Sequence, residues 1–375
     1  MDNITHTLVG AVLAETGLKR LTPLATTTLL IGANFPDIDI VVSPLGQLAY
    51  LEHHRGITHA LVGIPLLSLL LAALVYVGSR WWQQRQPEHK TARFGPLLVL
   101  SLVSISTHPL LDFTNSYGWR PYLPWNRQWF YGDIDFVVDP WLWAGLGGVV
   151  MWAQAKTRVH FIGWGVLFTA LAVPVLLFGG TSWGTRMLWL AMVGGFFLLR
   201  AKIALHPVST SRLFRGVILA LLFYFGVLTW VHFKLLARAQ EQSASLIETG
   251  ETVMKVDALP LPANPLRKSA VITTDKAFYI FDLHLLSSHN SGDIPSLRRA
   301  VRVVGDAAAV AAALREPEFQ AFLRFARFPV IEAARKPDQT TEVKVRDIRF
   351  ELDGRTGSSF HTSVQLDAQM RRIVE

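Results

Sequence analysis

The chain has 375 residues, 51% hydrophobic and 17% charged, and its positive mean hydropathy argues against an ordinary soluble globular protein. It contains no cysteine, which excludes disulfides, thiolate zinc sites and a cysteine nucleophile. Residues 1–239 hold 18 Lys and Arg against 10 Asp and Glu, whereas residues 240–375 hold 18 of each, so the net charge of +8 lies in the apolar part. Basic loops between membrane helices explain this excess, and we expect no nucleic-acid partner.

Apolar runs in chain order predict a bundle of membrane helices. Runs near residues 5–18 and 21–35 are too short to be secure spans and predict a short helical hairpin or a re-entrant pair. Residues 57–79 then form an uncharged run of 23 residues, long enough to cross a hydrocarbon core of about 30 Å. Further runs follow at about 94–112, 139–155, 159–180, 185–200 and 213–236. We expect a polytopic all-α membrane bundle with about six to eight membrane-embedded helices.

The charges of the loops orient this bundle. On the predicted topology, one side carries 12 Lys and Arg and the other carries 6, so the first side is cytoplasmic by the positive-inside rule. Counting through the spans, the chain leaves the last one on the non-cytoplasmic side. We therefore expect a multi-pass protein of the bacterial inner (cytoplasmic) membrane, with the lipid bilayer as its surroundings and its C-terminal part outside the cytoplasm.

Residues 240–375 read as an extramembrane α+β domain. The stretches "SAVITTDKAFYIFDLHLL" and "TEVKVRDIRFEL" have the β-branched and aromatic content of strands. The stretch "DAAAVAAALREPEFQAFLRFARF" predicts helix, interrupted near Pro317. We divide the chain into a membrane-embedded metal-site region (1–155), additional transmembrane helices (156–239) and this C-terminal domain (240–375).

Imidazoles and carboxylates from five segments fall on the predicted side opposite the basic loops. They are His6; Asp37 and Asp39; His53, His54 and His59; His108 and Asp112; and Asp133, Asp135 and Asp139. On a helix His108 and Asp112 share one face, with Cβ atoms about 5–6 Å apart, the geometry of paired metal ligands. His54 and His59 flank Gly56, which suits a loop followed by the first turn of a helix.

A simpler interpretation exists for several of these residues. A single histidine at a membrane edge is more often an interfacial hydrogen-bonding residue than a ligand, and five of the residues read individually as helix N-caps or solvated loop charges. These five are Asp39, His53, Asp133, Asp135 and Asp139. Ionisable groups close to apolar spans are costly unless paired, however. We therefore predict a divalent metal site, with zinc expected first and manganese or iron as alternatives, formed by Asp37, His54, His59, His108 and Asp112.

Four motifs in order carry a family resemblance over about residues 1–155: "THTLVGAVLA", "GANFPDID", "HHRGITHALVG" and "THPLLDFTNSYGWRPYLPW". They resemble the YdjM-like family of LexA-binding, inner-membrane-associated, metal-dependent hydrolases. The order Asp, His, His-x-x-x-Asp is also similar to that of zinc-dependent phospholipases C, all-helical enzymes with a metal cluster.

The second resemblance implies a metal shell of Asp37, His54 or His59, His108 and Asp112, with His6 near a second ion. Those enzymes add a histidine pair and a glutamate downstream, whereas no histidine occurs here between residues 109 and 159. The resemblance therefore implies one or two ions rather than three, with Asp133 or Asp139 completing the shell.

These observations predict an inner-membrane metal-dependent hydrolase of a phosphoester, or another ester, in a lipid or amphiphile, acting through metal-activated water. Arg55 is expected to bind the phosphate or headgroup, and Asp39 to act as general base. The alternative is a membrane-bound regulatory or interaction protein of the LexA-binding type, in which the metal site is structural or vestigial. A transporter is a third possibility, but it needs polar residues deep in the spans, and residues 159–200 carry only Arg186 and Arg200, near span ends.

Overall fold

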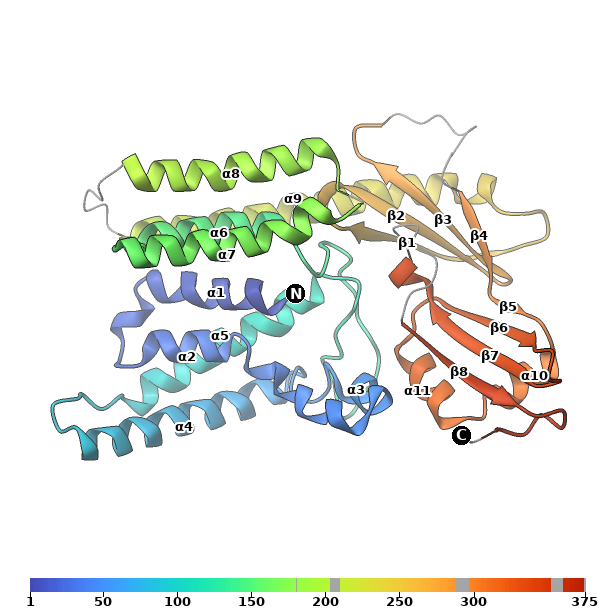
Figure 1. The fold of residues 1–375 in the computed structure, drawn as a ribbon, viewed down its shortest axis with the longest axis horizontal. Coiled ribbons are helices and arrows are strands. Elements are labelled where there is room, and N and C mark those ends of the chain that lie inside the picture. Colours follow the sequence, from blue (N-terminus) through green and yellow to red (C-terminus); the bar gives the residue numbers. More distant parts are fainter. Residues whose placement is uncertain (180, 203–209, 288–296, 352–359, 374–375) are drawn as a thin grey trace. The chain divides into compact units, whose positions relative to one another are not determined.

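A computed structural model describes residues 1–179, 181–202, 210–287, 297–351 and 360–373, and contacts divide the chain into two compact units. The first unit comprises Met1–Asp39, Arg55–Thr229 and Pro262–Pro265. The second comprises Ile40–His54, Trp230–Leu261 and Leu266–Glu375. The first is built from helices and the second carries the β-sheets (Figure 1).

The helices of the first unit follow the apolar runs of the sequence. A short pair comes first, α1 (Asn3–Glu15) and α2 (Ala25–Gly32), joined through the 3-10 turn η1 (Leu18–Arg20). The 3-10 helix η2 (Phe35–Leu45) starts in this unit and leads to α3 (Gln47–His53) of the second unit. The remaining helices are α4 (Gly63–Arg85), α5 (Phe94–Phe113), α6 (Pro140–Gln154), α7 (Arg158–Leu177), α8 (Trp183–Lys202) and α9 (Thr210–Leu246), the last of which continues into the second unit.

Four described helices are long and apolar enough to cross a bilayer: Gly63–Arg85, Phe94–Phe113, Arg158–Leu177 and Ser211–Leu246. A fifth span is counted if α2 and η2, which meet at a bend of 47°, form one broken span. The expected six to eight membrane-embedded helices are therefore not confirmed. With 13 and 15 residues, α1 and α6 extend only about 20 and 23 Å, short of a core of about 30 Å.

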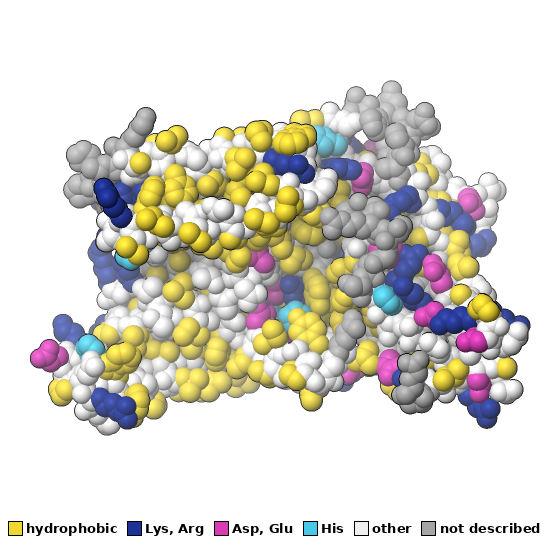
Figure 2. Space-filling view, in the orientation of Figure 1, with side chains coloured by type: hydrophobic (Ala, Val, Ile, Leu, Met, Phe, Trp, Pro, Cys, Tyr) yellow, Lys and Arg dark blue, Asp and Glu magenta, His cyan; other side chains and the backbone are white. Residues whose placement is uncertain are grey.

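The surface of the helical unit has the character of a lipid-facing one. On α4 the leucines Leu66, Leu69, Leu70 and Leu74 are between 45% and 60% exposed. Figure 2 shows hydrophobic side chains spread over these helices. Such exposed apolar faces are favourable only where hydrocarbon rather than water surrounds them.

Close contacts between α1, α2 and α5 determine where their polar ends meet. A Cβ on Gly10 of α1 would lie 2.8 Å from the carbonyl oxygen of Leu29, and a Cβ on Gly32 of α2 would lie 2.0 Å from Ser104 Oγ of α5. Small residues allow helix backbones to approach in an apolar environment. The start of α1, the end of α2 and the end of α5 are thereby brought to one place.

The second unit contains two four-stranded sheets. The first has the order β1-β2-β3-β4, where β2 pairs antiparallel with β3 and β3 with β4. The second has the order β5-β6-β7-β8, with a parallel β5–β6 pair and antiparallel neighbours otherwise. The strands are β1 (Val253–Leu261), β2 (Asn264–Thr274), β3 (Ala277–His284), β4 (Arg298–Val301), β5 (Val303–Val304), β6 (Pro329–Arg335), β7 (Thr341–Asp347) and β8 (His361–Leu366).

The elements predicted for this domain are confirmed. Both strand-like stretches form strands, and the second ends at Asp347, where the 3-10 helix η3 (Ile348–Glu351) begins. The predicted helix is indeed two helices, α10 (Ala307–Ala313) and α11 (Pro317–Phe325), because Pro317 occupies the first turn of α11, where its missing N–H costs nothing. An apolar core of this domain consists of residues from or next to the strands: Leu259, Val271, Phe278, Ile280, Phe328, Val330 and Ile348.

Candidate metal centre

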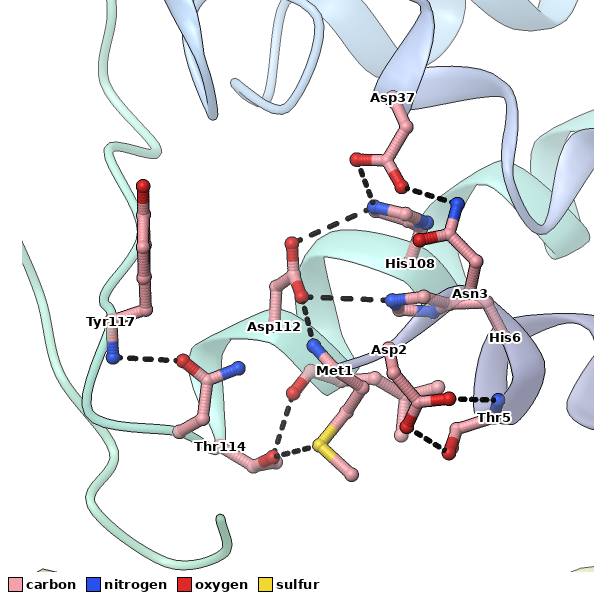
Figure 3. Close-up of polar contacts among 12 residues, drawn as sticks. Met1, Asp2, Asn3, Thr5, His6, Asp37, His108, Asp112, Thr114 and Tyr117 are labelled. Atoms are coloured by element: carbon pink, nitrogen blue, oxygen red, sulfur yellow. Dashed lines mark hydrogen bonds and ion pairs between the residues drawn. The ribbon is translucent and has the colours of Figure 1, made fainter. Parts of the chain in front are cut away.

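Four segments of the first unit bring imidazole and carboxylate groups together, and Figure 3 shows His6, Asp37, His108 and Asp112 from three of them. His6 lies near the start of α1, Asp37 in η2, His59 in the loop before α4, and His108 and Asp112 in the last two turns of α5. We call these five residues the His–Asp cluster. All three imidazoles are 0% exposed and Asp112 is 1% exposed, so these groups are costly to bury unless they share a cation.

Two histidines of the cluster present lone pairs to each other. The Nε2 atoms of His59 and His108 are 3.1 Å apart. Nδ1 of His108 lies 2.7 Å from the carbonyl oxygen of Ala33, which only accepts, so this nitrogen carries the ring proton. Nδ1 of His59 faces Thr58 Oγ1 at 3.0 Å and an Asp39 carboxylate oxygen at 3.4 Å, which places its proton there as well. The facing Nε2 atoms repel each other unless a cation lies between them, and this is the tautomer that metal ligands need.

Two carboxylates surround the same nitrogens. Asp37 Oδ1 lies 3.4 Å from His59 Nε2 and 3.3 Å from His108 Nε2. Asp112 Oδ2 lies 3.6 Å and 3.5 Å from these two atoms. Ligand atoms bound at about 2.0–2.2 Å to a zinc-sized ion lie roughly 3.0–3.6 Å from their neighbours in the shell. The spacings therefore fit ligands that share an ion.

His6 forms a second part of the cluster. Its ring stacks on that of His108 with centroids 3.8 Å apart, and its Nε2 lies 3.6 Å from Asp112 Oδ1. Both ring nitrogens are buried without a hydrogen-bond partner among the residues that the structure describes. Burial, followed by the neighbouring His108, lowers the pKa of His6 to about 3, so the ring is neutral and keeps an unused lone pair. His6, His108 and Asp112 thus form one group able to hold an ion, beside the group of Asp37, His59 and His108.

The donor set fits a divalent metal better than a proton. Burial lowers the pKa of His59, so a second proton on this ring is disfavoured and the ring stays neutral. Imidazole and carboxylate ligands without sulfur suit zinc, manganese and iron, whereas magnesium and calcium prefer oxygen alone. Asp112 also contacts the amino group of Met1 and, with 2.8 Å between Oδ1 and Nη2, the guanidinium group of Arg55 (Figure 3 shows the Met1 contact). The site therefore already attracts positive charge.

Asp39 lies behind the ligand atoms. Its Oδ2 accepts a hydrogen bond of 2.9 Å from the backbone N–H of Arg55 and faces Nδ1 of His59, on the side of the ring away from the cluster. Asp39 is 7% exposed. This position favours a role in orienting His59 over the predicted role as general base.

Arg55 is likewise occupied by the protein. Its guanidinium group, in a side chain 5% exposed, donates to the carboxylate of Asp112, to Asn115 Oδ1 at 3.1 Å and to the carbonyl oxygen of Gly118 at 2.9 Å. These contacts favour holding Asp112 in place over the predicted binding of a substrate phosphate.

The remaining predicted residues have further contacts. His54 belongs to the second unit, where its ring stacks on Tyr50 with centroids 4.6 Å apart, and it stays a predicted ligand, whereas His59 is one of the three imidazoles of the cluster. Asp139 caps α6 by accepting from the N–H of Trp141 at 2.7 Å, as the N-cap interpretation expects, and it accepts the hydroxyl of Tyr224 at 2.6 Å. Asp139 and Asp133 belong to neither ligand group of the described first unit.

Two asparagines that the sequence analysis did not single out support the cluster. Asn3 Nδ2 donates to Asp37 Oδ2 at 3.0 Å, and Asn115, 0% exposed, accepts from Arg55. The position of Asn3 offered a signal, because it is three residues before His6 on the same face of α1, whereas Asn115 lies two residues beyond the end of α5.

Comparisons with known proteins match two regions of the chain. The family described as YdjM inner membrane protein matches residues 1–184, and the YfhP C-terminal alpha/beta plait domain matches residues 308–375. The uncharacterized protein YfhP of Bacillus subtilis (strain 168) is 24% identical over 163 residues, which cover 40% of this chain and 46% of that protein. No solved structure matches the chain. Residues 1–184, which contain the whole His–Asp cluster, thus match the YdjM inner membrane protein family, and residues 308–375 match a C-terminal domain of the YfhP type.

Proposed function

We propose that this protein is a membrane-bound, metal-dependent hydrolase that cleaves a phosphoester, or another ester, of a lipid or amphiphile. The observation that carries the proposal is the pair of Nε2 lone pairs of His59 and His108, 3.1 Å apart and flanked by the carboxylates of Asp37 and Asp112. Zinc is the expected ion, with manganese and iron as alternatives, and the two ligand groups accommodate one or two ions.

The chain's own residues have distinct tasks in this proposal. His59, His108, Asp37 and Asp112 hold the ion, and His6 together with Asp112 Oδ1 holds a second one. A bound divalent ion supplies Lewis acidity, which makes water a better nucleophile and polarises a phosphoryl oxygen. Asp37 has the most exposed carboxylate of the cluster, with 22% of its side chain accessible, so substrate and water approach from its side.

The depth of the cluster supports an amphiphilic substrate. His108 precedes the end of α5 at Phe113 by five residues, about 7.5 Å along the helix axis. If α5 spans the bilayer, its 20 residues match a hydrocarbon core of about 30 Å, so this depth lies just inside the edge of that core, near the ester bonds beneath the headgroups. A scissile bond of a membrane lipid reaches such a site without leaving the bilayer.

Metal content tests the proposal. We would purify the protein in detergent without added metal and determine zinc, manganese and iron by elemental analysis, alongside His108→Ala and the exposed control His160→Ala. We expect near-stoichiometric metal in the wild type and in H160A, and its loss in H108A. A phosphoester screen with and without chelator would follow on the loaded protein.

The outcomes separate the two functions considered. Folded wild-type protein that takes up no metal even after reconstitution removes the hydrolase proposal. Tightly held metal with no turnover of any phosphoester or carboxylester favours the membrane-bound regulatory or interaction protein, in which the ion is structural.

A further inference from the structure

The segment after α5 folds back against the loop that carries His59. Trp119 and Phe130 exchange backbone hydrogen bonds of 2.8 Å in each direction, which closes residues 119–130 into a compact loop. Trp119 Nε1 donates to the carbonyl oxygen of His59 at 2.7 Å, and the N–H of Leu61 donates to the carbonyl oxygen of Pro121 at 2.9 Å. The loop is therefore tied to a metal-ligand segment by two hydrogen bonds.

This loop and its neighbour expose large apolar side chains. Trp125 is 79% exposed and Tyr122 49%, and on the adjoining segment Ile57 is 48% and Leu61 49% exposed. We call these four residues the aromatic collar. Four exposed side chains of this size on connected segments are unfavourable in water, so the collar requires a partner.

The position of the collar identifies the partner as the lipid bilayer. Leu61 precedes the start of the candidate span α4 by two residues, and exposed leucines follow along α4, beginning with Leu66. The loop itself cannot enter the hydrocarbon, because its irregular backbone would leave N–H and C=O groups without partners there. Tyrosine and tryptophan prefer the boundary between these regions, and the exposed Arg127 beside Trp125 suits a layer of lipid phosphates.

We propose that the aromatic collar is a lipid-binding surface seated in the headgroup layer next to the His–Asp cluster. Its second role rests on the proposed function: by holding headgroups beside His59 and Asp37, it delivers the lipid's ester to the metal. The collar thereby makes a bilayer-embedded lipid, rather than a water-soluble ester, the preferred substrate.

Immersion depth tests the surface without any need for activity. Because the chain has no cysteine, Trp125→Cys, Leu70→Cys and Asp338→Cys each provide a single site for a nitroxide label in the full-length protein, reconstituted in vesicles of phosphatidylcholine and phosphatidylglycerol. Leu70 of α4 is the hydrocarbon reference and the exposed Asp338 is the water reference. We expect the ratio of collisions with oxygen to collisions with a water-soluble nickel complex at position 125 to lie between the two references, closer to that of Leu70.

Two results overturn the proposal. A ratio at position 125 equal to that at 338 means that the collar lies in water. An immobilised label reached by neither reagent means that protein, not lipid, covers it.

A kinetic measurement addresses the second role. If hydrolysis is found, W125A should raise KM for lipid in vesicles about tenfold more than KM for a short-chain ester. A tenfold change corresponds to about 1.4 kcal/mol of binding free energy, the order expected from burying one indole in the bilayer. An equal rise for both substrates would refute delivery by the collar. Failure to find any hydrolysis would count against the proposed function and leave the depth measurement intact.

Discussion

The guanidinium group of Arg55 contacts the carboxylate of Asp112, with 2.8 Å between Nη2 and Oδ1, although 57 residues separate them in sequence. Arg55 has a left-handed backbone with φ of 52°, and its N–H is held there by Asp39. The ring of Tyr117 lies against the other side, with its centroid 4.5 Å from the guanidinium carbon. Arg55 is thus fixed before any ligand binds, and it fixes Asp112 in turn.

Arg55→Lys should weaken metal binding without unfolding the protein. Lysine keeps the charge but cannot contact Asp112, Asn115 and Gly118 together, because its single ammonium lacks the planar fork of arginine. We expect a loss of about 10–100-fold in metal affinity, the usual effect of removing a group that orients a ligand. Competition with a chelator measures it. The exposed Arg127→Lys is the matched control, and equal affinities for R55K and R127K would contradict the assigned role.

Asp139→Asn should stabilise the protein at neutral pH. Burial raises the pKa of Asp139 above its ordinary value of 3.8, so folding favours the protonated form. The stability that it contributes is therefore complete at acid pH and is lost as the pH rises through the raised pKa. Asparagine keeps the acceptor for Trp141 and removes the charge, and we expect a gain on the order of 1 kcal/mol at pH 7.5 that vanishes near pH 4. Thermal unfolding in detergent across this range would show it; a variant less stable at every pH would mean that ionised Asp139 is the favoured partner of Tyr224.

Asp347 should be essential to the C-terminal domain. It is 0% exposed and accepts from Arg349 Nη2 at 2.7 Å and from the backbone N–H of Arg327 at 2.9 Å. Asp347→Ala removes a buried carboxylate that pairs with the guanidinium of Arg349, and breaking a buried ion pair in this way costs about 3–5 kcal/mol. Hydrogen exchange of the β7 amides in the whole chain measures the loss. The half-exposed pair of Glu342 and Lys336 provides the control, since E342A should cost less than about 1 kcal/mol. Similar losses of stability in both variants would refute the essential role of Asp347.

The C-terminal domain should lie on the same side of the membrane as the His–Asp cluster. The helices from α4 to α9 include four candidate spans, α4, α5, α7 and α9, and an even number of crossings returns the chain to the side from which it started. In the cysteine-free chain, we expect Gln128→Cys and Asp338→Cys to react with an impermeant maleimide from outside intact cells, and Glu88→Cys, in the basic loop, to react only after permeabilisation. Opposite accessibility of positions 128 and 338 would refute the predicted topology.

Local sequence spacing was sufficient to predict part of the candidate metal centre. His108 and Asp112 are one helical turn apart, and their Nε2 and Oδ2 atoms lie 3.5 Å from each other in the folded chain. The helix break at Pro317 and the strands of the C-terminal domain were also predictable, since proline and β-branched residues act through their own backbone preferences. Spacing did not distinguish His54 from His59, because both suit a loop next to a helix.

The sequence by itself determined the kinds of ligand available, the absence of sulfur among them and the apolar helices that surround them, since these follow from composition and from periods of a few residues. Only the tertiary structure decided that His59 and His108 point their lone pairs at each other, and that Asp39 and Arg55 lie behind the ligands. Those facts depend on contacts such as His108 with Ala33 and Arg55 with Asp112, between segments 75 and 57 residues apart. No local preference encodes such contacts, because they arise only when segments that are distant in sequence pack together.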